Sequence, residues 1–240
     1  MQQYDAIRRS GAGSAAIDEG LRGYMNRVYG LMAVAMVITG AVAFFIGNSP
    51  ALLQAIFGSP LKWVVMFAPL AVVFGFSAMI HKMSNATAQI VFWVFAALMG
   101  ASISYIFAVF TGVSIAQTFF ATAIAFGGLS LYGYTTKRDL SAMGSFLVMG
   151  VIGLIVASIV NIFIASSALQ FAISALGVLI FAGLTAYDTQ SIKNEYLGMA
   201  QMGAEGQAYM QKGAIMGALR LYMDFLNMFM FLLQFMGNRN

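Results

Sequence analysis

Two acidic residues, Asp188 and Asp224, lie inside long apolar stretches of a chain in which charge is scarce. The other six acidic residues lie in polar segments: Asp5, Asp18, Glu19, Asp139, Glu195 and Glu205. An ionisable group at membrane depth costs about 2.5–3.5 kcal/mol on insertion scales, and such residues usually mark ion paths, proton relays or catalytic sites. Asp188 and Asp224 are therefore the first candidates for a functional site.

If the two carboxyl groups share a site of low dielectric, both cannot easily be ionised, and the pair titrates as a unit. A shared proton would link two helices, and its loss would create a repulsion that separates them or attracts a cation. A hard cation such as calcium suits carboxylate oxygen but usually takes six to eight ligands. We therefore expect weak, transient calcium binding at Asp188 and Asp224, of the kind that permeation needs.

Several polar side chains near the pair in sequence can support it. They are Thr185, Tyr187, Thr189, Tyr222, Asn227 and Arg220. Arg220 also permits a plainer interpretation, because it stands four residues from Asp224 on the same helix face and can simply neutralise that carboxylate. The sequence leaves both interpretations open.

A second polar group, Lys137-Arg138-Asp139, lies in a short connection between apolar segments. It is either a positive anchor at the membrane surface or an ion pair that closes the mouth of the aspartate site. The single histidine, His81, stands beside Lys82 at the end of an apolar segment and is interpreted as an interfacial residue. With one histidine and no cysteine, no catalytic triad, thiolate metal site or cofactor is expected.

The composition requires lipid as the solvent for most of the chain. Hydrophobic residues make up 61% of the sequence and charged residues 8%, whereas a soluble domain carries about 25% charged residues. The net charge of +4 does not indicate nucleic-acid binding, because the basic residues are scattered singly among the connections. The chain is predicted to be a polytopic membrane protein whose first partner is the bilayer.

Seven apolar segments reach the length of about 20 residues that a membrane-spanning helix needs. They cover residues 24–46, 62–80, 87–110, 115–132, 141–164, 169–191 and 217–236. Backbone groups at membrane depth must be satisfied internally, so an all-α seven-helix bundle is predicted for residues 24–240. Residues 1–23 are expected to form a flexible tail that leads into an interfacial helix at 17–28. The link over residues 192–216 is expected to hold an interfacial helical turn or to be mobile.

The distribution of lysine and arginine predicts an orientation. Ten of the twelve basic residues fall on one set of flanks, and only Lys62 and Arg239 fall on the other. The positive-inside rule then places the N-terminus in the cytoplasm and the C-terminus outside. Asp188 and Asp224 lie at the cytoplasmic ends of spans six and seven, about 6–8 Å inward from the basic boundary. The two carboxylates can therefore be neighbours.

Four segments carry motifs that resemble one family. They read GLRGYMNRVY at 20–29, SLYGYTTKRDL at 130–140, GLTAYDTQ at 183–190 and ALRLYMDFLN at 218–227. They resemble the bacterial branch of the Bax inhibitor-1 family. The resemblance implies a seven-helix protein with a central last helix, a pH-sensitive calcium leak, and a two-aspartate sensor at Asp188 and Asp224. Some members carry a balancing charge in the second span, whereas this chain has none between Lys62 and His81.

The leading expectation is a pH-gated cation leak of the bacterial inner membrane, with calcium and protons as ligands and no enzymatic activity. One alternative is a regulatory partner of a membrane-bound quality-control protease, with the tail over residues 1–16 as its handle. Another is an intramembrane aspartyl protease, which the Tyr187-Asp188 pair fits. That class needs Gly-x-Gly-Asp at its second acid, and this chain has bulky residues before Asp224.

Overall fold

The computed structural model describes residues 2–240, with side chains over 17–80, 82–207 and 209–240. The expected roles of His81 and of the tail over residues 1–16 therefore lie outside the described side chains. The elements are α1 (Gln2–Gly47), α2 (Pro50–Phe57), α3 (Leu61–Met79), η1 (Ile80–Lys82), α4 (Asn85–Ile103), α5 (Ile106–Val109), α6 (Gly112–Thr135), α7 (Ser141–Ile164), α8 (Ser167–Gln201) and α9 (Ala204–Met236). Within the described range there is no strand beyond a single antiparallel bridge between Phe110 and Arg239. The all-α prediction is confirmed.

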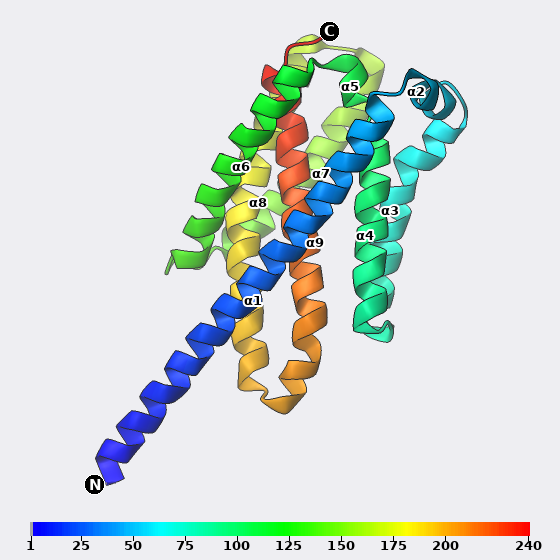
Figure 1. Ribbon diagram of the computed structural model, residues 1–240. Helices are drawn as coiled ribbons and strands as arrows, with labels where there is room; N and C mark the ends of the chain where they lie inside the picture. The colour runs from blue at the N-terminus through cyan, green and yellow to red at the C-terminus, as the bar shows by residue number, and fades with distance from the viewer. Residues whose placement is uncertain (1) are drawn as a thin grey trace.

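Within the part of the chain that the structure describes, seven helical segments are long and apolar enough to cross a membrane. They are Ile17–Gly47, Leu61–Met79, Asn85–Val109, Gly112–Thr135, Ser141–Ile164, Ser167–Gln201 and Tyr209–Met236. The number of spans is the predicted one. The two ends of the chain lie at opposite ends of the bundle, as an odd number of crossings requires (Figure 1).

Hydroxyl side chains fix where four of the helices begin. Ser49, Ser84, Thr111 and Ser166 each accept a hydrogen bond from the backbone N–H three residues later, at the starts of α2, α4, α6 and α8. Such N-caps satisfy donors that the first helical turn would otherwise leave unpaired. The short polar connections in the sequence thus set the boundaries of the spans.

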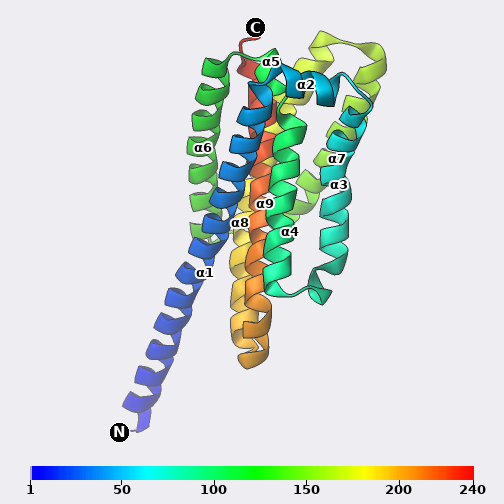
Figure 2. The same cartoon turned by 45° about the vertical axis from the view of Figure 1, so that its right-hand side comes forward.

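The last helix occupies the middle of the bundle. Helix α9 packs against α8, α1, α6 and α4 and runs through the centre in both views (Figures 1 and 2). The most apolar stretch of α9 is 61% buried, against 11–39% in the other six spans. The predicted central seventh helix is confirmed. By contrast, α3 and α7 expose most of their apolar side chains and so form the lipid-facing rim.

The link over residues 192–216 differs from its prediction. Helix α8 continues to Gln201, α9 begins at Ala204, and only a two-residue turn separates them. Gly203 in this turn has φ of 64°, a conformation that costs glycine little. The expected helical structure in this link is confirmed, but the link is not a separate interfacial or mobile segment, because the two spans extend into one long helical hairpin beyond the ends of α4 and α6 (Figures 1 and 2).

At the N-terminus, α1 is continuous from Gln2 to Gly47. No break in the helix marks the expected boundary between a tail ending at residue 23 and the first span. The division of the chain at residue 23 stays a prediction.

Candidate functional site

The α8–α9 hairpin brings Asp188 and Asp224 together. Their carboxyl groups lie within hydrogen-bonding reach of each other. Asp224 is only 4% exposed, and its Oδ2 atom is buried with no hydrogen-bond donor among the described groups. A proton held by one of the two carboxyl groups can supply the missing donor, because a carboxylic acid donates through its O–H. The geometry thus suits a pair that shares one proton.

A second charged pair stands beside the aspartates on the same two helices. Arg220 of α9 forms a bidentate ion pair with Glu195 of α8, with Nη1–Oε1 at 2.8 Å and Nη2–Oε2 at 2.9 Å. Both side chains of this ion pair are about one-third exposed. The charge of Arg220 also acts on both aspartates. Arg220 therefore binds Glu195 directly and neutralises the aspartate pair from a distance.

Both aspartates and Arg220, but not Glu195, border a cavity of about 640 Å³ between α3, α7, α8 and α9. Asp188, Arg220 and Asp224 line it together with the amide side chain of Asn227. Apart from the hydroxyl of Ser158, the remaining wall is aliphatic or aromatic. The arrangement is an apolar chamber with carboxyl oxygens and one guanidinium at its polar edge.

The other expected supporting residues point away from this chamber. The Tyr222 hydroxyl forms a 2.6 Å hydrogen bond with Thr39 of α1, and its ring packs edge-on against Phe92 and Phe95 of α4. Tyr187 lies against Gly144, where a Cβ atom would collide with its ring. These two tyrosines therefore lock neighbouring helices together instead of lining the cavity.

The two threonines also face other helices. Thr185 and Thr189 are fully buried, and their hydroxyls donate to backbone carbonyls one turn earlier in α8. Thr189 contacts the hydroxyl of Ser130 at 3.0 Å, and Ser130 contacts Tyr29 at 2.6 Å. This hydroxyl chain joins α8 to α6 and α1. Of the supporting residues expected from the sequence, only Asn227 and Arg220 line the chamber.

The group Lys137-Arg138-Asp139 lies in the α6–α7 connection, where all three residues are exposed. Two side chains of α8 tie this connection down, and sequence reasoning missed both. Gln190 bonds the Arg138 carbonyl at 2.7 Å and the Leu140 N–H at 2.9 Å, while Lys193 donates to the Tyr134 carbonyl at 2.8 Å. The whole connection is thereby fastened to α8 one turn from the aspartate pair.

Asp139 helps to start α7. Its Oδ1 atom accepts a hydrogen bond of 2.9 Å from the backbone N–H of Ser141, and hydrogen bonding from the Ser141 hydroxyl and backbone lowers the pKa of this carboxyl group. A lowered pKa in the folded state means that the carboxylate stabilises the fold at neutral pH and that this contribution is lost on acidification.

We therefore expect Asp139→Ala to lower the thermal unfolding temperature in detergent at pH 7, and the difference from wild type to shrink as the pH falls through the acidic range. Asp139→Asn is the matched control, because asparagine keeps an acceptor at the start of α7. Equal unfolding temperatures for wild type and Asp139→Ala at pH 7 would contradict this role.

No preformed metal cluster is evident in the described part of the chain, since no group of three or more His, Cys, Asp or Glu residues gathers there. Asp188, Asp224 and Asn227 offer oxygen ligands on one wall of the chamber. Calcium usually takes six to eight oxygen ligands, so water must complete its shell at this position. The donor set suits a cation in passage.

A family model described as Inhibitor of apoptosis-promoting Bax1 matches residues 21–240, which include both aspartates and every span. The chain belongs to the Bax inhibitor-1 family. The resemblance drawn from the four sequence motifs is thereby confirmed.

Bacterial relatives cover nearly the whole chain. An uncharacterized protein of Rickettsia prowazekii is 47% identical over 224 residues, which is 92% of each protein. Inner membrane protein YbhL of Escherichia coli is 45% identical over 221 residues, covering 92% of this chain and 93% of YbhL. An uncharacterized membrane protein of Streptococcus pyogenes is 31% identical over 226 residues, covering 93% and 96%. Full-length similarity places this chain among Bax inhibitor-1 membrane proteins.

Proposed function

We propose that this Bax inhibitor-1 protein is a pH-sensitive leak for cations, calcium above all, gated by proton sharing between Asp188 and Asp224. The observation that carries the proposal is the pair itself. Two carboxyl groups from neighbouring helices lie within hydrogen-bonding reach and border a chamber of about 640 Å³. Ionisable groups at membrane depth typically mark ion or proton paths.

Opening of the proposed gate depends on whether Asp188 and Asp224 of the α8–α9 hairpin share a proton or are both ionised. While one proton is shared, the carboxyl groups attract each other and hold α8 against α9. When that proton leaves, two negative charges repel each other at short range in a poorly screened environment. The same charges draw a cation into the chamber. Ion flux is therefore expected to rise with pH.

The proposal includes a location and an orientation. Seven spans and similarity to an inner membrane protein support residence in the bacterial inner membrane. The ten basic residues on the flanks that share a side with the N-terminus support a cytoplasmic N-terminus and an external C-terminus. The aspartate pair then senses cytoplasmic pH.

The test is calcium flux into dye-loaded liposomes that contain purified protein, measured between pH 6 and pH 8. We expect wild-type flux to increase with pH. Asp188→Asn and Asp224→Asn should each reduce flux at pH 8 to nearly the level of protein-free vesicles, because an amide cannot ionise and the repulsion is lost.

Glu205→Gln is the matched control, because it removes an exposed carboxylate from the start of α9, outside the chamber. It should leave both the flux and its pH dependence unchanged. If both aspartate variants conduct as the wild type does across this pH range, the proposed gate does not exist.

A further inference from the structure

We propose that the groove between α1 and α6 binds a phospholipid with an anionic headgroup, whose phosphate lies at Arg22 and whose acyl chain follows α6. This site is separate from the aspartate pair and does not rest on the proposed leak.

The groove exists because α1 and α6 pack on other helices. Helix α1 lies mainly on α4 and α9, while α6 lies on α8 and α9. Two cavities open along the gap between α1 and α6. One, of about 540 Å³, is bordered by residues 22–29 of α1 and 126–134 of α6. The other, of about 360 Å³, is bordered by residues 36–44 of α1 and 112–120 of α6, with further walls from α4, α5 and α9. They follow the same two helices through the two halves of the bundle.

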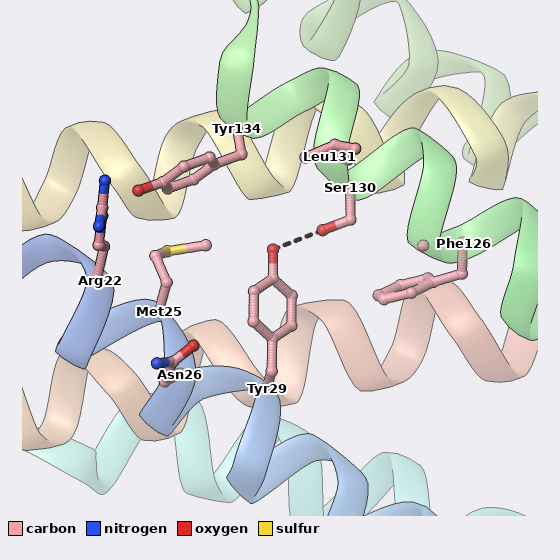
Figure 3. A pocket seen from close by; sticks show the side chains of 9 residues that line it. Arg22, Met25, Asn26, Tyr29, Phe126, Ser130, Leu131 and Tyr134 are labelled. Atoms are coloured by element: carbon pink, nitrogen blue, oxygen red, sulfur yellow. Dashed lines mark hydrogen bonds between the residues drawn. The ribbon is translucent and has the colours of Figure 1, made fainter.

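Hydrogen-bond donors gather at one end of the larger cavity. Figure 3 shows the Arg22 guanidinium and the Tyr134 hydroxyl side by side there, with the Asn26 amide on the same wall. Within the described residues, none of these three side-chain polar groups has a hydrogen-bond or ion-pair partner. Lys193 adds positive charge, with its ammonium 5.4 Å from the Tyr134 ring centroid. A guanidinium presents paired donors that match phosphate oxygens.

The rest of the groove is mostly apolar. Beyond the polar end, the larger cavity is bordered by Met25, Phe126, Gly127 and Leu131, and by Tyr29 and Ser130, whose hydroxyls are hydrogen-bonded to each other. The smaller cavity is bordered almost entirely by aliphatic and aromatic side chains. One leaflet of the hydrocarbon core is about 15 Å deep, or about ten residues of helix. An acyl chain whose headgroup is at Arg22 would therefore run along the whole larger cavity.

Charge and apolar length together identify the ligand. A free phosphate ion would satisfy Arg22 but would leave the apolar wall bare, and an uncharged lipid would leave the guanidinium without an anion. An anionic phospholipid satisfies both. The site lies on the side of the N-terminus, where the basic residues are concentrated. Basic residues near a membrane surface attract anionic lipids.

The test measures lipid retained by the purified full-length protein in detergent. The protein is mixed with micelles that contain phosphatidylglycerol or phosphatidylcholine of identical acyl chains, and bound lipid is counted by native mass spectrometry. Wild type should prefer phosphatidylglycerol. Arg22→Gln should weaken phosphatidylglycerol binding at least about fivefold, in line with the loss of one basic contact. It should weaken phosphatidylcholine binding less, because the choline ammonium offsets the charge of that lipid's phosphate.

Arg27→Gln is the matched control for charge, since Arg27 is exposed on α1 but does not border the cavity. A second pair of variants tests the acyl-chain part. A Cβ atom at Gly127 or at Gly128 meets nothing within 4 Å, so leucine fits at either position without a clash. Only Gly127 borders the cavity, and Gly127→Leu should block retention while Gly128→Leu should not.

Three results would overturn the proposal. The first is equal retention of phosphatidylglycerol and phosphatidylcholine by wild type. The second is an equal loss of phosphatidylglycerol in Arg22→Gln and Arg27→Gln, which indicates general attraction to a basic surface. The third is complete displacement of the lipid by millimolar glycerol phosphate, which indicates a site for the phosphate group alone.

Discussion

If the proposed leak exists, replacing Arg220 by glutamine is expected to raise the pH at which it opens by about one pH unit, the effect that one nearby opposite charge typically has on a carboxyl group. Arg220 is the cation whose charge acts on both Asp188 and Asp224. Without it, the ionised pair loses its attraction to a positive group, so a higher pH is needed to remove the shared proton. The measurement is the pH of half-maximal calcium flux in liposomes.

Glu195→Gln should shift the same midpoint in the opposite direction. Glu195 holds Arg220 in a direct ion pair, and its own negative charge acts against ionisation of Asp188. Glutamine removes that repulsion and leaves Arg220 free to turn toward the aspartates. Within the described residues, α3 and α7 contribute no titratable side chain to the chamber. Tyr24 of α1 lies near both Glu195 and Arg220, but a phenol is uncharged between pH 6 and pH 8, so the four charged groups on the hairpin carry the effect. Shifts of the same sign in both variants would refute this electrostatic account.

Most of the architecture could be predicted because spans that lie in lipid appear in the sequence as long apolar runs. Long apolar runs can only be spans, and Ser or Thr at their starts predicts where each helix begins, as Ser84 and Ser166 do. The full length of the α8–α9 hairpin does not show in the mean polarity, because residues 192–216 are rich in Gly, Gln and Met. Ile192 and Ile215 are almost fully buried, so this polar-looking segment is an amphipathic pair of helices.

The candidate site was predictable in its centre and not in its surroundings. Equal depth on adjacent antiparallel helices sufficed to bring Asp188 and Asp224 together. Which side chains lie beside the pair depends on how each helix is rotated about its own axis, because successive side chains on a helix point about 100° apart. Thr189, next in sequence to Asp188, therefore faces Ser130 of α6 and not the chamber. The pairing of Arg220 with Glu195 needed the same rotational information.

The largest structural effect is expected from Gly133→Ala. Helices α6 and α8 approach so closely at Gly133 that a Cβ atom there would lie 2.1 Å from the backbone oxygen of Ala186. Backbone cannot yield as a flexible side chain can, so the helices must separate. Overpacking of this kind typically costs about 1–3 kcal/mol. The contact lies two residues before Asp188, so the separation should also disturb the aspartate pair.

The free energy of unfolding, measured by titrating denaturing detergent into mixed micelles, checks this expectation. Gly128→Ala on the same helix is the matched control, because a Cβ atom there meets nothing within 4 Å. It should be neutral or stabilising by up to about 1 kcal/mol, since alanine is favoured over glycine in helices. If Gly133→Ala is as stable as Gly128→Ala, the backbone contact with Ala186 does not set the spacing of α6 and α8. A loss confined to Gly133→Ala shows that glycine holds α6 close enough for Ser130 to contact Thr189, beside the gate.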